Sequence, residues 1–200
     1  MKGYYFITDT QLSRAGNVSD VQNAVAVGVE VIQYRCKDAA TAGLYAEAAV
    51  LRKLCQGTLF LINDRVDIAL AVAADGVHLG QEDLPIGIAR KLLGKKKVIG
   101  LTVHSVAEAR LAEAAGADYL GVAPIFATLT KADAGRPAGV QLIRQIKSAV
   151  KIPLVAIGGI NLANAPEVIQ AGADALCAIS AVVTRPDVPA EIKKFQRLFQ

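Results

Sequence analysis

"TLFLINDRVDIALAVAADGVHL", residues 58–79, is the segment that decides the fold. Its two ends, 58–63 and 76–79, are short apolar runs, and a helical pattern that begins near Asp64 separates them. Apolar runs without strict alternation are typical of strands buried on both faces of a parallel sheet. A strand, a helix and a second strand in this order predict one β/α unit.

The same unit recurs along the whole chain. We expect strands at 4–8, 29–34, 58–63, 76–79, 97–102, 118–123, 153–157 and 175–179. Apolar residues between the runs recur at helical spacing, as in three stripes: Leu44, Ala48, Leu51 and Cys55; Gly139, Ile143, Ile146 and Val150; Val188, Ile192, Phe195 and Phe199. Gly28, Gly57, Gly116 and Gly172 follow helical stretches, as helix-ending glycines do. Eight alternations predict a TIM (β/α)8 barrel rather than an open doubly wound sheet. No linker divides the chain, so residues 1–200 are expected to form a single catalytic domain.

Composition narrows the class of protein. The chain is 53% hydrophobic, yet no apolar run approaches the roughly 18 residues of a membrane span, and the first residues do not resemble a signal peptide. We therefore expect a cytoplasmic protein that does not bind membranes. The net charge of +4 suits an anionic ligand, but the cations are too scattered for nucleic acid. Three cysteines without Cys-x-x-Cys spacing, and only two histidines, argue against a disulfide framework, a zinc knuckle and a histidine-rich metal site.

Polar residues gather where the predicted strands end. Active sites of (β/α)8 barrels lie at the carboxyl ends of the strands, so these residues are expected to share one mouth. Two glycines and Ile179 share these strand ends with the polar residues. The full set is Gln33, Arg35, Lys37, Asn63, Asp64, Gln81, Asp83, Thr102, His104, Thr128, Thr130, Lys131, Gly158, Gly159, Ile179 and Ser180.

The segment "QYRCKD", 33–38, ends the second strand with two cations around a thiol. It is open to three interpretations: a redox or metal site, a solvated strand end, or a pocket for an anion. Alternation along a strand points Gln33, Arg35 and Lys37 to the same side and Cys36 to the other, towards the helices. This favours the anion pocket and makes Cys36 a packing residue.

Asp64 and Asp83 follow neighbouring strands, so their carboxylates could meet. Such a pair can act as an acid and a base, or hold a hard cation. The nearby cations Arg35, Lys37 and Lys131 favour Mg²⁺ with a polyphosphate. The alternative for Asp64 is an N-cap of the helix that begins there.

Two further segments are suited to phosphate. "AIGGIN", 156–161, and "AIS", 178–180, follow the seventh and eighth strands, where barrels often bind phosphate, although Gly-Gly could form only a turn. The loop 123–137 is either a lid or a long connection, and its Thr128, Thr130 and Lys131 suit phosphate oxygens. His78 is interpreted as a hydrogen-bonded barrel residue, and the tyrosines and phenylalanines as core.

The sequence resembles the thiamine phosphate synthase family over nearly its whole length. The most specific matching segments are "QYRCK", "INDRVDIALAVAADGVHLGQEDLP", "GADYLGVAPIFATLTK" and "IPLVAIGGIN". The resemblance implies a transferase of thiamine biosynthesis. It would condense 4-amino-2-methyl-5-(hydroxymethyl)pyrimidine diphosphate with 4-methyl-5-(2-phosphooxyethyl)thiazole, and release thiamine phosphate and pyrophosphate.

The resemblance also implies residue roles. The pyrimidine diphosphate would contact Gln33, Tyr34, Arg35, Cys36, Lys37, Asn63, Thr102 and Lys131, of which Arg35, Lys37, Thr102 and Lys131 would be catalytic. The thiazole phosphate would contact Thr128, Leu129, Thr130, Gly159, Ile179 and Ser180, and the Mg²⁺ cofactor would bind Asp64 and Asp83.

Three positions depart from the family pattern. Cys36 stands where the family often has Glu, Thr102 where it often has Ser, and Ala123 and Ala127 where Gly and Pro are usual. The alternatives are a thiazole tautomerase-like relative, whose typical histidine after strand six is missing from "APIF", and a non-catalytic phosphate-binding sensor. The sequence leaves the oligomeric state open, a homo-oligomer included.

Overall fold

The computed structural model describes residues 1–128, 130 and 135–200. Within them, eight parallel strands form a closed barrel in the order β1 to β8. The strands are β1 (Gly3–Ile7), β2 (Val31–Tyr34), β3 (Leu59–Asn63), β4 (Gly76–Leu79), β5 (Val98–Val103), β6 (Tyr119–Val122), β7 (Leu154–Ile157) and β8 (Ala175–Cys177). The helices are α1 (Asn17–Ala26), α2 (Thr41–Leu54), α3 (Val66–Ala71), α4 (Ile86–Leu93), α5 (Val106–Ala114), α6 (Gly139–Ala149), α7 (Ala165–Gln170), α8 (Ile179–Val183) and α9 (Val188–Arg197).

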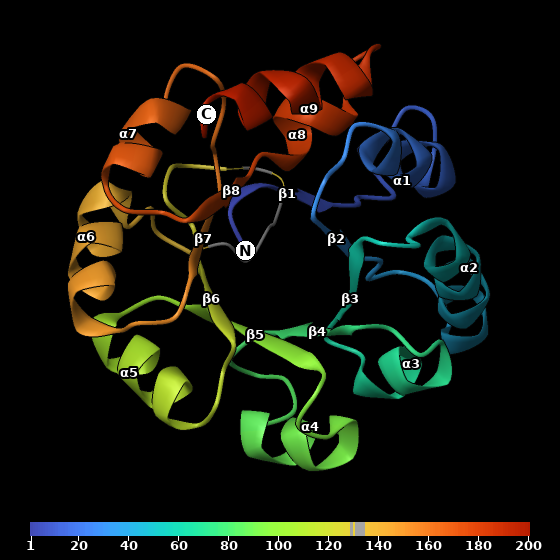
Figure 1. Cartoon of the computed structure of the whole chain (residues 1–200), viewed down its shortest axis with the longest axis horizontal. Helices are drawn as coiled ribbons and strands as arrows, with labels where there is room; N and C mark the ends of the chain where they lie inside the picture. Colours follow the sequence, from blue (N-terminus) through green and yellow to red (C-terminus); the bar gives the residue numbers. More distant parts are fainter. Residues whose placement is uncertain (129, 131–134) are drawn as a thin grey trace.

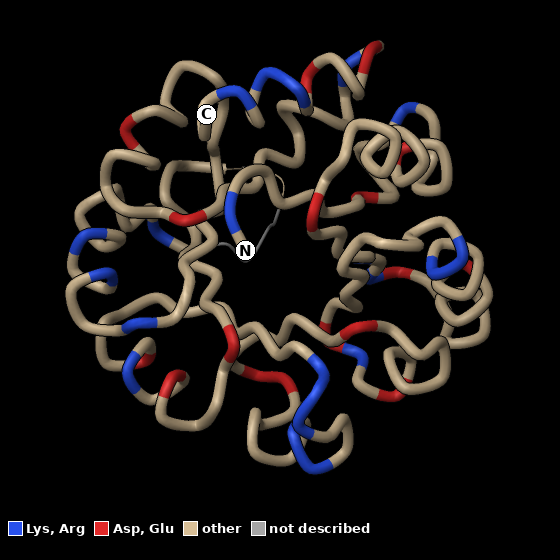
Figure 2. Tube along the Cα trace, in the orientation of Figure 1, with Lys and Arg blue, Asp and Glu red and all other residues tan. Residues whose placement is uncertain are grey.

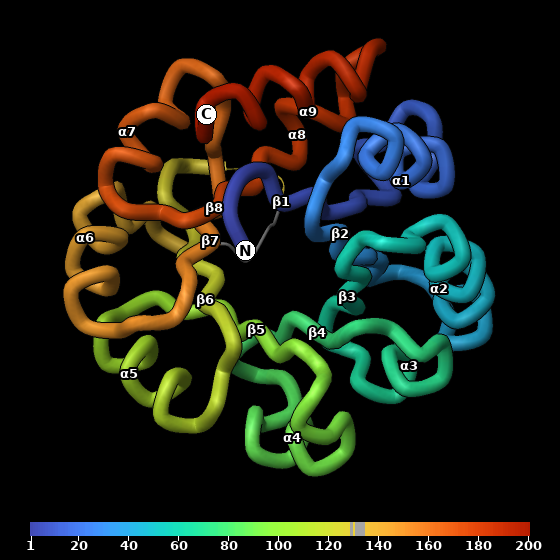
Figure 3. The backbone as a smooth tube through the Cα atoms, in the orientation of Figure 1, coloured from blue at the N-terminus to red at the C-terminus, as the bar shows by residue number. Residues whose placement is uncertain are grey.

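The helices surround the barrel as an outer ring (Figure 1). The chain winds around the barrel in one direction, and each strand pairs with the next along the sequence (Figure 3). Pairing of Gly3 with Ala175 and of Tyr4 with Leu176 closes β1 onto β8. The (β/α)8 barrel predicted from the sequence is therefore confirmed.

Alternation along the strands separates two apolar cores. Tyr4, Phe6, Ile32, Phe60 and Ile62 face outward into the larger core, which the helices cover. The alternate positions face the barrel axis and form a smaller core of Tyr5, Ile7, Val31, Leu61, Tyr119, Val155, Ala175 and Cys177. A strand buried on both faces needs apolar residues at successive positions, which explains the continuous runs in the sequence.

The observed strand ends differ from the expected ones by up to two residues. β1 ends at Ile7, and just beyond it the Thr8 hydroxyl accepts the backbone N–H of Arg35 at 2.9 Å. β8 ends at Cys177, because Ile179 already begins α8. Of the helical stripes, Leu44, Ala48, Leu51 and Cys55 are all buried, whereas Phe199 lies beyond the end of α9 and is only partly buried. The four glycines expected to end helices all have positive φ, between 72° and 107°.

Three aspartates fasten the amino ends of the strands. Asp75, Asp118 and Asp174 each accept the backbone N–H of a residue at the start of the preceding strand, at 2.7–2.9 Å. Each also pairs with a cation of the helix that precedes that strand. Asp75 pairs with Arg52 of α2 at 2.9 Å, Asp118 with Arg90 of α4 at 2.6 Å, and Asp174 with Lys147 of α6 at 2.6 Å. Helix, strand and turn are thus joined at the end of the barrel opposite the predicted mouth.

Charges of both signs are interspersed around the ring of helices (Figure 2). The three cysteines are free thiols. Among the helices that the structure describes, none combines the length and the apolar character needed to cross a membrane.

Candidate active site

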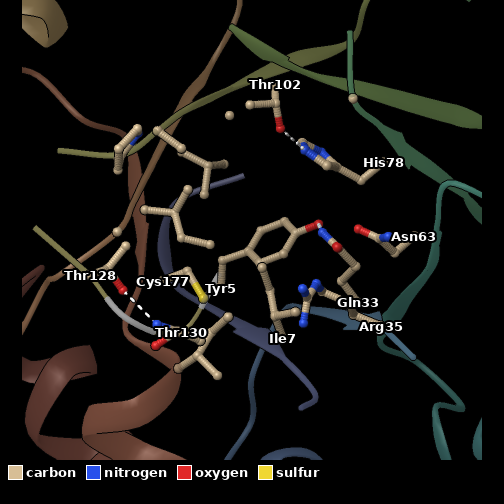
Figure 4. A pocket seen from close by; sticks show the side chains of 18 of the residues that line it. Tyr5, Ile7, Gln33, Arg35, Asn63, His78, Thr102, Thr128, Thr130 and Cys177 are labelled. Carbon is tan, nitrogen blue, oxygen red and sulfur yellow. Dashed lines mark hydrogen bonds between the residues drawn. The ribbon is translucent and has the colours of Figure 1, made fainter. Parts of the chain in front are cut away.

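A cavity of about 560 Å³ opens at the carboxyl ends of the strands. All eight strands contribute side chains or backbone to its lining, and Figure 4 shows part of it. The lining includes twelve of the residues to which the family resemblance gives a substrate or metal role: Gln33, Arg35, Lys37, Asn63, Asp64, Asp83, Thr102, Thr128, Thr130, Gly159, Ile179 and Ser180. Gln81, His104 and Gly158, which were also expected at the mouth, line it as well. The barrel therefore brings together residues that lie up to 147 positions apart, from 33 to 180.

The two cations after β2 lie in the cavity lining. Arg35 forms an ion pair with Asp9, at 3.1 Å, and Asp9 also accepts the backbone N–H groups of Gln11 and Leu12. Asp9 thus fixes the guanidinium at the rim and offsets its charge, while the Arg35 side chain stays 18% exposed and lines the cavity. The sequence interpretation missed Asp9, although it directly follows the first predicted strand.

Asp64 and Asp83 face each other across the ends of β3 and β4. Burial, the Asp83 carboxylate and its hydrogen bond together raise the pKa of Asp64 to about 6, and the Lys37 ammonium lowers it in part. Lys37 Nζ lies 3.5 Å from Asp64 Oδ2, and Asp83 Oδ2 accepts the backbone N–H of Gly80 at 2.6 Å. Two carboxylates held this close repel one another, which favours a cation between them.

Asp64 does not cap a helix. α3 begins at Val66 with Arg65 as N-cap and without a side-chain cap, which removes the alternative interpretation of Asp64. Instead Asp64 adopts a positive φ of 63°, and its backbone N–H donates to His78 O at 2.8 Å. This left-handed conformation is strained for a residue other than glycine, and such strain tends to gather at functional sites.

The donor set fits Mg²⁺. In the described part of the chain, no group of three or more His, Cys, Asp or Glu side chains could enclose a metal ion. Mg²⁺ needs only one or two carboxylates, because water and substrate phosphates complete its octahedron. Asp64 and Asp83 would supply those two carboxylates.

The opposite side of the cavity is built from backbone. Gly158 and Gly159 have φ of 100° and 64°. A Cβ at Gly158 would lie 2.7 Å from Pro124 Cβ, and one at Gly159 would lie 2.5 Å from Ala127 O. Phe126 N–H donates to Gly158 O at 3.0 Å. The glycine pair therefore does more than form a turn: it holds the segment after β6 against the β7–α7 loop.

Two of the predicted substrate contacts point away from the cavity. Tyr34 is buried and donates its hydroxyl to Glu47 Oε2 at 2.5 Å, and Cys36 packs against the core between barrel and helices. Neither is among the cavity-lining residues, because both occupy strand positions alternate to Gln33, Arg35 and Lys37. The side chains of Tyr34 and Cys36 therefore do not line the cavity, and their contact with the pyrimidine diphosphate stays a prediction. The predicted contacts Leu129 and Lys131 lie outside the described residues.

The sequence interpretation also missed two tyrosines. Tyr5 and Tyr119 were assigned to the core, and both are buried, but they line the floor of the cavity. Like Gln33, both occupy strand positions that face the barrel axis, and this alternation could have identified them from the sequence.

The two histidines lie near the same cavity. His78 is hydrogen-bonded as expected, at 2.8 Å to Tyr119 and to Thr102. His104 at the rim contacts Ala123 O through Nδ1 at 2.6 Å.

Comparisons with known proteins point to one family. Residues 4–182 match the family model described as thiamine monophosphate synthase. The chain is 54% identical over 193 residues to the thiamine-phosphate synthase of Methanosarcina barkeri, covering 96% of this chain and 88% of that protein. It is 48% identical over 197 residues to the thiamine-phosphate synthase of Chloroflexus aurantiacus, covering 97% and 91%. The solved thiamine phosphate pyrophosphorylase of Pyrococcus furiosus superposes with a TM-score of 0.90 at 43% identity, over 98% of this chain and 95% of that one.

Proposed function

The chain belongs to the thiamine monophosphate synthase family and makes thiamine phosphate, and we propose that it does so by a Mg²⁺-dependent condensation in this cavity. The substrates are 4-amino-2-methyl-5-(hydroxymethyl)pyrimidine diphosphate and 4-methyl-5-(2-phosphooxyethyl)thiazole, and the second product is pyrophosphate. The observation that carries the proposal is the facing pair Asp64 and Asp83 beside Lys37, in a cavity that also contains Arg35.

The two substrates occupy different sides of the cavity. Gln33, Asn63 and Thr102 contact the pyrimidine diphosphate, whereas Thr128, Thr130, Gly159, Ile179 and Ser180 hold the thiazole phosphate. The second assignment is supported by the two glycines with positive φ, which bring backbone amides close to a ligand, and by the hydroxyls on the facing loop. By resemblance to the family, we add Lys131 to the pyrimidine diphosphate contacts and Leu129 to the thiazole phosphate contacts.

The proposed reaction needs the side chains mainly to supply positive charge and to position the two substrates. The bond between the pyrimidine methylene carbon and the diphosphate oxygen breaks, and its electron pair leaves with pyrophosphate. The thiazole nitrogen then donates its lone pair to the resulting pyrimidine-stabilised cation, which forms the new carbon–nitrogen bond. When bound by Asp64 and Asp83, Mg²⁺ supplies positive charge to the leaving group. Arg35 and Lys37 add charge there, and the walls of the cavity align the substrates and exclude water.

The test is a coupled assay with both substrates, with Mg²⁺ or with a chelator. We expect thiamine phosphate and pyrophosphate in equal amounts with Mg²⁺, and loss of both without it. Asp83→Asn should abolish most of the turnover while the melting temperature stays near that of the wild type. Turnover that survives both chelation and Asp83→Asn would refute the metal assignment.

The same assay separates the alternative functions. Interconversion of thiazole isomers without pyrimidine would indicate a tautomerase, and binding of both substrates without turnover would indicate a sensor. The cytoplasmic location stays a prediction.

A further inference from the structure

The loop that follows β1 holds the segment that follows β2 through three side chains. The Thr8 hydroxyl accepts the backbone N–H of Arg35 at 2.9 Å and donates to the backbone carbonyl of the same residue at 3.3 Å. Asp9 accepts from the Arg35 guanidinium at 3.1 Å. Gln11 Nε2 donates to Asp38 Oδ2 at 2.7 Å. One loop therefore holds both the backbone and the side chain of Arg35, although the family resemblance gives none of its three residues a role.

Asp9 divides its two carboxylate oxygens between the loop and the guanidinium. Oδ1 accepts the backbone N–H groups of Gln11 at 3.2 Å and of Leu12 at 3.0 Å. Oδ2 accepts from Arg35 Nη1. The residue is only 4% exposed, so the carboxylate is fixed in the loop by burial as well as by hydrogen bonds. The loop thereby sets the direction of the guanidinium.

Asp9 reaches Arg35 from behind the wall of the cavity. Arg35 lines the cavity on the same side as Gln33 and Asn63 (Figure 4). Asp9 is not among the described residues that line it. A guanidinium carries five N–H donors in a rigid fork, so a partner at Nη1 leaves the edge formed by Nε and Nη2 for two phosphate oxygens.

A carboxylate beside a cation that binds an anion has two opposite effects. Its negative charge weakens the attraction between the cation and the anion. Its hydrogen bond selects one of the many rotamers of the arginine before the ligand arrives, so the ligand does not have to order the side chain.

We propose that orientation outweighs the loss of charge, and that Asp9 is a positioning residue that directs the Arg35 guanidinium towards the leaving pyrophosphate. The contact between Arg35 and the leaving group rests on the proposed function. Asp9 itself touches no substrate and acts only through Arg35. The donor is then in place before the pyrimidine diphosphate binds, as preorganised electrostatic stabilisation requires.

Asp9→Asn separates the two tasks of the carboxylate. The carboxamide oxygen can still accept the N–H groups of Gln11 and Leu12, but the amide nitrogen cannot accept from Arg35. We expect kcat/KM for the pyrimidine diphosphate to fall about 10-fold, since a displacement of about 1 Å in a positioning group can cost up to about 100-fold. The KM for the thiazole phosphate should not change. An unchanged or higher kcat/KM in folded Asp9→Asn would overturn the inference.

A double-mutant cycle shows whether Asp9 acts through Arg35. Arg35→Ala alone should lose about 100-fold in kcat/KM. Adding Asp9→Asn to it should change kcat/KM by less than about twofold, because the group that Asp9 orients is already gone. The same loss in both backgrounds would make Asp9 a structural residue only and refute the positioning role.

Glu191→Gln is the matched control. It also removes a carboxylate from an ion pair, with Lys194 at 2.6 Å, but on α9. We expect an unchanged kcat/KM. A loss as large as that in Asp9→Asn would refute a specific role for Asp9.

A measurement on the wild type keeps the test valid if Asp9→Asn does not fold. Nitrogen-15 spectra of the guanidinium groups report rotation about their carbon–nitrogen bonds, and Arg35→Lys identifies the Arg35 signal by its loss. We expect restricted rotation of Arg35 without substrate. Free rotation would overturn the inference, because the guanidinium would then have no fixed direction.

The outcomes distinguish this inference from the proposed function. If Arg35→Ala keeps full kcat/KM, the proposed contact with the diphosphate fails, and the inference fails with it. If Arg35→Ala loses activity but folded Asp9→Asn does not, only the present inference fails. If the wild type turns over without Mg²⁺, the metal assignment fails, and the double-mutant cycle still decides the role of Asp9.

Discussion

At the mouth, the direction in which a residue faces on its strand decides whether its side chain lines the cavity or packs against the helices. Arg35 faces the cavity and is anchored by Asp9, whereas its neighbour Cys36 packs between barrel and helices. One step along the chain thus separates a guanidinium that lines the cavity from a packing thiol, because successive side chains of an extended segment point to opposite sides.

This difference predicts opposite results for two adjacent substitutions. Arg35→Ala should lower kcat/KM for the pyrimidine diphosphate by about 100-fold, since a charge-assisted contact to the leaving group is lost. Cys36→Ser should leave kcat/KM within about threefold of the wild type, which corresponds to less than about 1 kcal/mol. Steady-state kinetics with saturating thiazole phosphate measure both. Equal losses in the two variants would contradict the orientation described here.

The raised pKa of Asp64 predicts a pH-dependent cost in stability. The pKa is 3.8 for the free side chain and about 6 in the folded protein. The folded state is therefore penalised fully above about pH 6, and the penalty disappears as the pH falls towards 3.8. Asp64→Asn should raise the free energy of unfolding of the metal-free protein by about 1–3 kcal/mol above pH 6, and by little near pH 4.

Urea unfolding with a chelator, at several pH values, measures this difference. Added Mg²⁺ should stabilise the wild type more than Asp64→Asn, because the carboxylate that costs stability is also the proposed ligand. A variant that is destabilised throughout the pH range would show that Asp64 is a structural residue.

At the scale of elements, the β7–α7 loop and the segment after β6 form one unit. Gly158 and Gly159 combine positive φ with a close approach to Pro124 and Ala127. Other glycines with positive φ, such as Gly57 at 84°, have open space around the position of a Cβ. A side chain in the glycine pair would therefore move the segment that bears Thr128, whereas one at Gly57 would only strain the backbone.

The pair Gly159→Ala and Gly57→Ala separates these effects. Both should lose about 1 kcal/mol of stability or more from the positive φ. Only Gly159→Ala should raise the KM for the thiazole phosphate, by about 10-fold, because a contact that holds the phosphate is displaced. Thermal unfolding and thiazole titrations measure the two quantities. An unchanged KM in Gly159→Ala would remove this loop from the thiazole subsite.

At the scale of the whole molecule, aspartates at the two ends of the barrel have different roles. At the carboxyl ends, Asp64 and Asp83 face each other in the cavity. At the amino ends, Asp75, Asp118 and Asp174 accept backbone N–H groups and pair with cations. Division of a (β/α)8 barrel into a catalytic and a stabilising end is general, and here the same residue type serves both ends.

Asp75→Ala is the matched counterpart of Asp64→Asn. It leaves the Phe60 N–H and the Arg52 guanidinium without their carboxylate, so we expect a loss of about 1–3 kcal/mol in the free energy of unfolding. The kcat should not change, because Asp75 lies at the end away from the cavity. The two variants should therefore shift stability in opposite directions and activity in only one case. A loss of kcat in folded Asp75→Ala would show that the two ends are coupled.

The sequence by itself determined the eight strands, their order and most of the mouth. Burial on both faces of each strand required continuous apolar runs, and the polar residues after the runs had to meet once the strands were parallel. Twelve of the residues to which the family resemblance gives a substrate or metal role line the cavity for this reason.

Only the tertiary structure decided which contacts cross the barrel. Tyr5 and Tyr119 are 114 residues apart on strands that do not pair, and their hydroxyls meet only because the sheet closes on itself. Asp9 reaches Arg35, and the glycine pair seats the segment after β6, through contacts between different β/α units. A local pattern with a period of two residues states which side of a strand a residue occupies, but it carries no information about what lies opposite across the barrel axis.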